Sequence, residues 1–526
     1  MKKIIYLFTL TLAFVSCNDY LDVNETTNSP ILDDVPSRLL LPGAQVASFR
    51  IQTITMNNLG SIMTNAWGAN VNAFTGANSR EYTQNFDNTF NAGIWDGLYT
   101  NINNFQRIID NQTPNQENYI AISKIMKAYY MQYIVDLYGD APYYEAFQGQ
   151  ANLTPSYTDD KEIYRALVQE LEEARELIAN SPDAEEAGTD VVFGGDMDKW
   201  VTFANTIELR LILRQSNLTD AETVTYRNEK LAELAALNDF VTEDVTINPG
   251  FSAANDDQQN PFFGTLVNTA GQTLQTYQAT TASGHFASFL NGTQTAPYNT
   301  SGLVDPRRGR IFTLITGEVS GVIQGDVSQT AGGTAPLTVS RLGVGITGLA
   351  NGSANGGNGS VVNGSERDGF IMLAAESFFL QAEAAVRYPG VFSADARTLF
   401  EQGITASFEF YSPVYVGVTT LPALDAAPYI AASDSKSGIG WTASADKVQA
   451  ILTQKWIALS GVHGIEPFLD LIRTGYPVTP MAVTAAPGAT KPKRLLYPQS
   501  EYTSNRLNVP NLTLPQIFEQ GAFWTN

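Results

Sequence analysis

Cysteine and histidine are nearly absent from this chain. Cys17 is the only cysteine in 526 residues, so no disulfide within the chain holds the fold together. His285 and His463 are the only histidines, which excludes a metal site built from several histidines. After the first 16 residues, no apolar run approaches the roughly 20 residues that a membrane-spanning helix needs. The body of the protein is therefore not predicted to cross a bilayer.

Positive charge is also scarce. The chain has 31 Lys and Arg against 53 Asp and Glu, which gives a formal net charge of −22. A surface of this sign repels nucleic acid and anionic lipid headgroups, so neither is an expected partner. Aromatic residues, in contrast, make up 11% of the chain, and some of them could serve as stacking surfaces for a ligand.

The first residues have the layout of a bacterial secretion signal. Residues 1–16 read MKKIIYLFTLTLAFVS: two lysines, a short apolar run, and a small residue directly before Cys17. A cysteine at this point can be acylated on its sulfur and on its new amino group, and several acyl chains anchor a protein stably. We therefore predict a signal peptide over 1–16 and a lipidated, polar tether over 17–36.

The rest of the chain is predicted to be mainly α-helical. Apolar residues recur every three or four positions in several segments, which predicts helices there. These segments are Asn118–Leu137, Asp159–Asn180, Asp198–Gln215, Phe370–Arg387, Ser393–Phe410 and Ala443–Ser460. Helical hairpins of this kind resemble a right-handed tetratricopeptide-like array, and an irregular helical bundle is the alternative.

The middle section, 217–365, has a different composition. It is rich in Thr, Gly, Asn and Gln, and we predict a large loop-rich insert carrying a few short strands, for example at 321–324 and 337–346. The stretch 349–365, LANGSANGGNGSVVNGS, is of low complexity and is predicted to be a loop. We assign 37–526 to a single helical domain that contains this variable part.

Motifs for cofactors are weak. Residues 343–348 match GxGxxG, but the Gly/Asn-rich stretch that follows is not typical of the helix that a dinucleotide site requires. No cofactor is predicted. A calcium site made of oxygen ligands alone stays open, and Asn255–Asp257 is a conceivable fragment that lacks the spacing of a known calcium loop.

Two carboxylates could suggest an enzyme. Glu376 and Glu383 lie seven residues apart, on nearly the same face of one predicted helix, and could form an acid/base pair. The alternative is that they bond loop backbone, or arginines across a helix interface; Arg210 and Arg214 lie one turn apart and can reach carboxylates on a neighbouring helix. We prefer this alternative, because no separate nucleophile or metal set accompanies the pair.

One segment combines the groups that bind sugars. Residues 67–82, WGANVNAFTGANSREY, mix aromatic rings, on which sugars stack, with amides that bond hydroxyl groups. The candidate ligand-binding residues are Trp67, Asn70, Asn72, Phe74 and Tyr82. An ordinary surface loop is the alternative. Tyr277 and Trp441 are weaker candidates, and Trp456 is expected in the core.

Several blocks of sequence, in a fixed order, resemble one family. They are VDLYGDAPYYEAFQG (135–149), VVFGGDMDKWVTFANTIELRLILR (191–214), VDPRRGRIF (304–312), MLAAESFFLQAEAAVR (372–387), FEQGITASFEFY (400–411), QKWIALSGVHGIEPFLDLIRTGYP (454–477) and PKRLLYPQSEYTSN (492–505). On these blocks the chain is similar to the SusD/RagB family of nutrient-binding outer-membrane lipoproteins of Bacteroidetes, and within it to the second SusD-like subfamily.

The resemblance implies a function. Such proteins are surface lipoproteins on a tetratricopeptide-like scaffold that act as a lid over a SusC-type TonB-dependent transporter and deliver a glycan or peptide to it. They are not catalytic. A surface glycoside hydrolase, or a structural or adhesive lipoprotein without a small ligand, are the alternatives, and the sequence does not separate oligosaccharide from peptide as the ligand.

Overall fold

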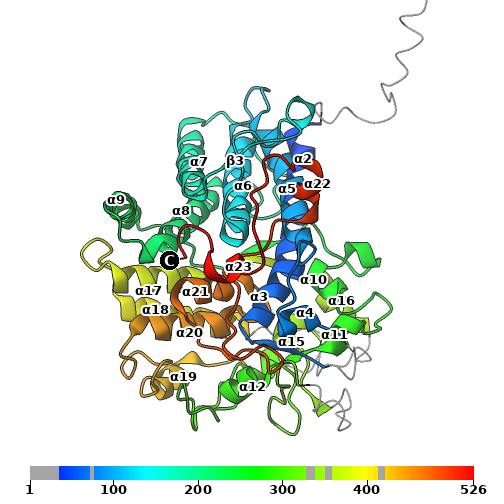
Figure 1. Cartoon of the computed structure of the whole chain (residues 1–526), viewed down its shortest axis with the longest axis vertical. Coiled ribbons are helices and arrows are strands. Elements are labelled where there is room, and N and C mark those ends of the chain that lie inside the picture. The colour runs from blue at the N-terminus through cyan, green and yellow to red at the C-terminus, as the bar shows by residue number, and fades with distance from the viewer. Residues whose placement is uncertain (1–34, 71–75, 327–337, 350–357, 413–420, 526) are drawn as a thin grey trace, which may run out of the picture.

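The computed structural model describes residues 35–70, 76–326, 338–349, 358–412 and 421–525. The predicted signal peptide, Cys17 and nearly all of the predicted tether lie outside these ranges, as do Asn72 and Phe74. Helices make up most of the described chain, which confirms the mainly α prediction (Figure 1). None of these helices combines the length and the apolar character needed to cross a membrane.

The N-terminal half consists of consecutive helices that pack on one another. Its long helices are α2 (Ser37–Ile51), α5 (Ala92–Ile109), α6 (Glu117–Tyr138), α7 (Asp160–Asn180) and α8 (Met197–Arg214). Helix α5 packs on α2 and α6, α6 packs on α7, and α7 packs on α8 (Figure 1). The tetratricopeptide-like helical hairpins expected from the sequence are therefore present.

The C-terminal half packs against the last of these helices. It contains α17 (Ala374–Arg387), α18 (Ala396–Phe410), α20 (Lys447–Leu459) and α21 (Ile465–Thr474). Helix α17 contacts α18, α20 and α8, while α21 contacts α20 and α3 (Asn57–Met63), which comes from the start of the chain. Distant parts of the sequence thus share one core.

Local sequence explains where the predicted helices begin and end. Asp159 caps α7, since its carboxylate accepts hydrogen bonds from the backbone N–H of Lys161 and Glu162. Asp196 caps α8 in the same way. Helix α6 ends at Gly139, whose φ of +76° is accessible to glycine and costly for other residues.

The middle section contains more helix than the sequence suggests. Helix α9 (Ala221–Leu237) lies inside the predicted loop-rich part, 217–365, so that prediction is wrong for these residues. Its polar surface explains the error, because most of α9 faces solvent and only a narrow stripe is buried. Helix α16 (Asn358–Glu366) likewise falls within the predicted loop at 349–365, of which 350–357 lies outside the described residues.

The strands are short and pair antiparallel over long sequence distances. Strand β1 (Trp67–Ala69) pairs with β5 (Thr280–Ala282), β2 (Ala141–Pro142) with β3 (Tyr157–Thr158), and β4 (Val245–Ile247) with β6 (Gly369–Met372). In place of the predicted strands at 321–324 and in the described part of 337–346, the structure has isolated bridges at Val322, Arg341 and Leu342 and the start of the short helix α15 (Val344–Thr347).

The remaining elements are short and connect the long helices. They are η2 (Gln52–Met56), α4 (Ser79–Thr83), η3 (Gly149–Ala151), η4 (Gln215–Asn217), η5 (Asp256–Gln258), α10 (Pro261–Gly264), α11 (Gln275–Ala279), α12 (Gly284–Leu290), α13 (Arg308–Ile311), α15 (Val344–Thr347), α19 (Ala426–Ser433), α22 (Gln499–Ser504) and α23 (Gln516–Glu519). In Figure 1, α10, α11, α15 and α16 lie together at one side of the molecule.

Candidate functional site

The described residues of the predicted ligand-binding segment lie inside the protein. Trp67 is 3% exposed, Asn70 1% and Tyr82 5%. In this conformation the rings of Trp67 and Tyr82 are enclosed by protein, so neither can stack on a ligand. Asn72 and Phe74 lie outside the described residues, and a binding role for this segment stays a prediction.

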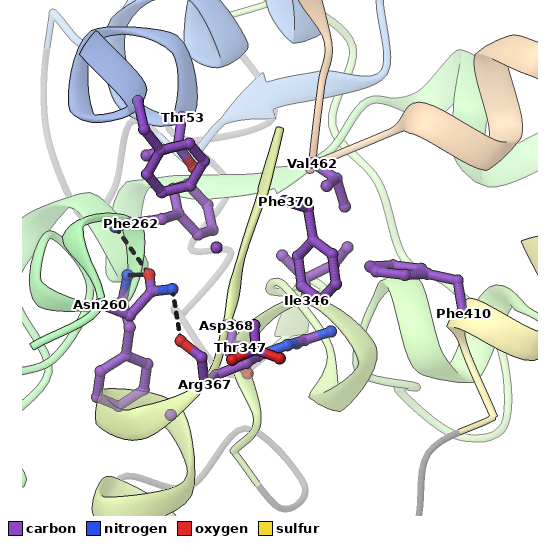
Figure 2. A pocket seen from close by; sticks show the side chains of 15 residues that line it. Thr53, Asn260, Phe262, Ile346, Thr347, Arg367, Asp368, Phe370, Phe410 and Val462 are labelled. Carbon is purple, nitrogen blue, oxygen red and sulfur yellow. Dashed lines mark hydrogen bonds between the residues drawn. The ribbon is translucent and has the colours of Figure 1, made fainter. Parts of the chain in front are cut away.

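The ring of Trp67 contacts Phe262, which belongs to a pocket lined by several phenylalanines. Its indole stacks on Phe262, with ring centroids 6.4 Å apart and an interplanar angle of 24°. Phe262 lines a pocket to which segments far apart in the sequence contribute (Figure 2). The lining residues are Phe49, Thr53, Asn260, Phe262, Phe263, Ile346, Thr347, Gly364, Arg367, Asp368, Gly369, Phe370, Phe410, Gly461 and Val462.

Asn260 positions one wall of this pocket. Its side-chain oxygen accepts hydrogen bonds from the backbone N–H of Phe262 (3.0 Å) and Phe263 (3.1 Å), and so caps α10. Pro261 occupies the first turn of this short helix, where its missing N–H costs nothing. The side-chain amide of Asn260 donates to the carbonyl of Arg367 (3.0 Å), as Figure 2 shows. One asparagine therefore ties α10 to the segment that carries the charged residues.

Charged and aromatic groups meet at the opposite wall. The guanidinium carbon of Arg367 lies 5.2 Å from the ring centroid of Phe370 and 5.5 Å from that of Phe410. These two rings contact each other edge to face, at 4.9 Å. Asp368 is exposed beside them and accepts a hydrogen bond from the side-chain amide of Asn248 (2.7 Å). The wall thus offers ring faces, a cation and a carboxylate within a few residues.

An irregular helix supplies the third side. Helices α2 and α3 are joined by η2, a single π-helical turn, and Thr53 of this turn lines the pocket. The turn is fixed by Gln52, whose side-chain amide donates to the carbonyl of Ile371 in β6 (2.8 Å). Such turns occur mostly as single-turn interruptions of α-helices and are frequent at functional sites.

The pocket is shallow, which limits what can enter it. Its cavity measures about 30 Å³, roughly the volume of one water molecule. Phe262 and Phe370 are half-buried, so part of each ring stays accessible. The site can hold a small group inside and a flat ring over its mouth, with Arg367 and Asp368 available for polar contacts.

The carboxylate pair that suggested an enzyme is buried in ion pairs. Glu376 contacts Arg210 (3.2 Å) and His463 (3.1 Å), and Glu383 contacts Arg473 at 2.5 and 2.8 Å and Arg387 at 2.6 Å. This confirms the preferred interpretation, in which the two carboxylates bond basic residues across helix interfaces.

The acidity of these groups also opposes catalysis by this pair. Burial raises the pKa of Glu383, but the charges of Arg473 and Arg387 outweigh it and lower the pKa to about 2. Burial likewise raises the pKa of Glu376, yet the contacts to His463 and Lys455 leave it below the ordinary value. A general acid of a glycosidase needs a raised pKa, so this pair lacks both substrate access and the required proton.

The same buried network holds the two halves of the protein together. Arg214 of α8 contacts Asp136 of α6 and both Glu466 and Asp470 of α21, at 2.8–3.3 Å. Lys455 of α20 contacts Asp470 at 2.9 Å. Glu466 accepts from Arg214 through both of its oxygens, so each charge here has a partner of opposite sign.

The weaker candidates have structural roles. Tyr277 is fully buried, Trp456 is 1% exposed as expected for a core residue, and Trp441 is half-buried against Phe400. The conceivable calcium fragment is a capped turn, because the side-chain oxygen of Asn255 accepts from the backbone N–H of Asp257 and Gln258.

The sequence analysis missed the aromatic and charged residues of the pocket. An asparagine directly before Pro261 could have indicated the start of α10. No local pattern, however, indicates that Phe262, Arg367, Phe370 and Phe410 come together, because they are up to 148 residues apart along the chain.

Comparison with known proteins identifies the family. Residues 40–498 match the second SusD-like family, which is described as "Starch-binding associating with outer membrane". The match covers most of the chain, and the protein therefore belongs to this SusD-like family. No curated protein is similar enough to this chain to count as a relative.

Solved structures show the same fold. A SusD-like protein from Bacteroides thetaiotaomicron superposes with a TM-score of 0.68 at 23% identity, covering 93% of this chain and 98% of that one. A chitin-binding SusD homologue from Flavobacterium johnsoniae gives a TM-score of 0.66 at 23% identity, with 89% and 94% covered. A SusD homologue from Bacteroides fragilis gives 0.67 at 20% identity, with 90% and 95% covered.

Proposed function

We propose that this protein is a cell-surface lipoprotein that binds an oligosaccharide and passes it to a SusC-type TonB-dependent transporter, over which it acts as a lid. The family, described as starch-binding and associated with the outer membrane, supports the binding role and the location. Cys17 at the end of a secretion signal supports lipid anchoring. The transporter partnership rests on the family resemblance.

The observation that carries the sugar-binding proposal is the pocket around Phe262. It offers the partly accessible rings of Phe262 and Phe370 beside the guanidinium of Arg367 and the carboxylate of Asp368. Sugars bind by stacking the apolar face of a ring on an aromatic side chain while planar polar groups bond their hydroxyls. We infer that one sugar ring covers the mouth of the pocket.

The predicted ligand-binding segment, 67–82, contacts this pocket through Trp67. The indole of Trp67 stacks on the ring of Phe262 and helps to hold it in place. Asn72 and Phe74 follow β1 closely along the chain, since this strand ends at Ala69. We therefore keep Asn72 and Phe74 as ligand-binding residues in the proposal, and assign Trp67 to the support of the site through its contact with Phe262. Asn70 and Tyr82 are buried, and we assign them no contact with the ligand.

The test is calorimetric titration of the mature chain, from Asn18 onward, with maltoheptaose, N-acetylchitohexaose and a mixture of peptides. Phe262→Ala is expected to weaken oligosaccharide binding by about tenfold or more, the value of one lost stacking contact. Tyr226→Ala is the control, since Tyr226 is a half-buried aromatic on α9, at the opposite side of the molecule in Figure 1.

Three results would contradict the proposal. Sugar binding that is unchanged in Phe262→Ala would place the site elsewhere. Binding of peptides with no heat from either sugar would make a peptide the cargo. Release of shortened sugars during the titration would indicate a hydrolase instead.

A further inference from the structure

A second groove lies between α5, α6 and α7, at the end of the molecule where α6 and α7 are seen in Figure 1. It encloses about 430 Å³, which is within the usual size of a small-ligand site. It has no lining residue in common with the pocket of Phe262. The residues that determine its chemistry are Lys127, Tyr143, Tyr144, Phe147, Gln169 and Glu170.

Glu170 has one oxygen that is bonded and one that is not. Its Oε1 accepts hydrogen bonds from the hydroxyl of Tyr143 (2.8 Å) and from the ammonium group of Lys127 (2.5 Å). Its Oε2 is buried and has no hydrogen-bond partner among the described residues. A buried acceptor without a donor is unfavourable, so a ligand that supplies a donor here would gain binding energy.

Tyr144 presents an aromatic ring beside this oxygen. Its side chain is 58% exposed, whereas the neighbouring Tyr143 is buried. The two rings meet edge to face at 5.1 Å, and the ammonium group of Lys127 lies 4.8 Å from the ring of Tyr143. Tyr143 is therefore held from two sides and supports Tyr144, which keeps a face open to solvent.

The backbone of Phe147, at the edge of the groove, has an unfavourable conformation. Its φ of +64° lies in the left-handed region, which is unfavourable for a bulky residue and is often found at ligand sites. Its ring packs on Tyr99, with centroids 5.7 Å apart. Together with Gln148 and Asp110, Phe147 also lines an adjoining hollow of about 870 Å³. The two hollows thus adjoin at three shared residues and offer space for an extended ligand.

We propose that this groove is a second saccharide-binding site, in which a sugar ring stacks on Tyr144 and one of its hydroxyls donates to Glu170 Oε2. The side-chain amides of Gln148 and Gln169 line the same groove and can bond further hydroxyls. The inference rests on the proposed function only for its ligand class.

The charges of the groove favour a neutral donor-rich ligand over an ion. An anionic ligand would face the unpartnered oxygen of Glu170. A cationic ligand would face Lys127 and Lys124, and the acidic groups nearest to them are already paired, Glu170 with Lys127 at 2.5 Å and Glu173 with Lys124 at 2.7 Å. A hydroxyl donates to the free oxygen without bringing a charge of either sign, and an aromatic ring accepts the apolar face of a sugar.

The number of saccharide-binding sites in the full mature chain can be measured by calorimetry and by NMR titration. The probes are maltoheptaose and N-acetylchitohexaose. We expect two sites for at least one probe. Tyr144→Ala, an exposed substitution, should remove or weaken one site by about tenfold and leave the other unchanged. Phe262→Ala is the matched variant for the first pocket and should do the reverse.

A second variant tests the hydrogen bond. Glu170→Gln keeps the shape of the side chain and removes its charge, and we expect it to weaken the same site that Tyr144→Ala weakens. Because Lys127 loses its partner, a thermal melt must show that the variant is folded. If Glu170→Gln does not fold, the Tyr144→Ala result decides.

The outcomes separate this inference from the proposed function. One site that Phe262→Ala abolishes and Tyr144→Ala leaves intact overturns the second site while supporting the first. A single site that only Tyr144→Ala abolishes supports the second site and overturns the first. If Tyr144→Ala changes the binding of neither probe, the inference is overturned.

Discussion

Replacing Glu383 by Gln tests whether the buried carboxylates hold the fold rather than perform chemistry. Glu383 is 1% exposed and contacts the guanidinium groups of Arg473 and Arg387 at 2.5–2.8 Å. The variant leaves Arg473 buried with only Asp470 as an acidic partner, at 3.0 Å. Removing one member of a buried ion pair typically costs about 3–5 kcal/mol, because the remaining charge is no longer compensated.

The pKa gives an independent magnitude. The carboxyl of Glu383 titrates at about 2 in the folded chain against the ordinary value of 4.5. A difference of this size corresponds to about 3 kcal/mol of stability above pH 4.5. Because the folded pKa is the lower one, this contribution is present above pH 4.5 and is lost as the pH falls from 4.5 towards 2. This contribution lies at the lower end of the about 3–5 kcal/mol typical for a broken buried ion pair.

The assay is thermal unfolding, with sugar binding measured on the same samples. For a chain of this size a loss of 1 kcal/mol lowers the melting temperature by about 1 °C, so we expect a decrease of about 3–5 °C. Glu401→Gln in α18 is the matched control. Its pair with Arg397 has the same i, i+4 spacing but is exposed at the surface, where such pairs contribute roughly 0–1 kcal/mol.

A melting temperature of Glu383→Gln equal to that of Glu401→Gln would show that the ion pair does not stabilise the fold. Sugar hydrolysis that is present in the natural chain and lost in this variant would make Glu383 catalytic. We expect binding to be unchanged and stability to fall.

Two further predictions follow from close packing and from burial. Gly60→Ala should destabilise the fold strongly, since a Cβ at this position would lie 2.0 Å from the carbonyl oxygen of Gly464, at the contact of α3 with α21. Gly43 on α2 has open space around it, so Gly43→Ala is the control and should be neutral or stabilise the fold by about 1 kcal/mol. Urea unfolding measures both variants. Burial and the charge of Lys491 lower the pKa of His285 to about 4, so its NMR titration should show a neutral ring down to about pH 5. Since the unfolded chain then binds a proton that the folded chain does not, His285 should make stability fall between pH 6.5 and 4; a normal titration near 6.5 would contradict this.

The sequence predicted several of the long helices well, but it did not predict α2 and α5 or the burial of Trp67 and Tyr82. Apolar spacing and capping residues such as Asp159 are local signals, and α6, α7 and α8 begin and end within a few residues of their predicted limits. Helix α9 was missed because its exposed surface hides the apolar period. Trp67 looked like a surface residue because a short loop-like segment does not show that it forms a strand, β1, which pairs with the distant strand β5.

The amino-acid sequence alone was enough to indicate the family and the helical hairpins and to predict an export signal, since each depends on residues that are neighbours along the chain. It also determined that Glu376 and Glu383 share a helix face. Only the tertiary structure decided that these carboxylates meet Arg210 and Arg473, and that Phe262, Arg367 and Phe370 surround one pocket. Contacts between distant residues depend on how the helices pack, and packing is a property of the whole core rather than of any segment.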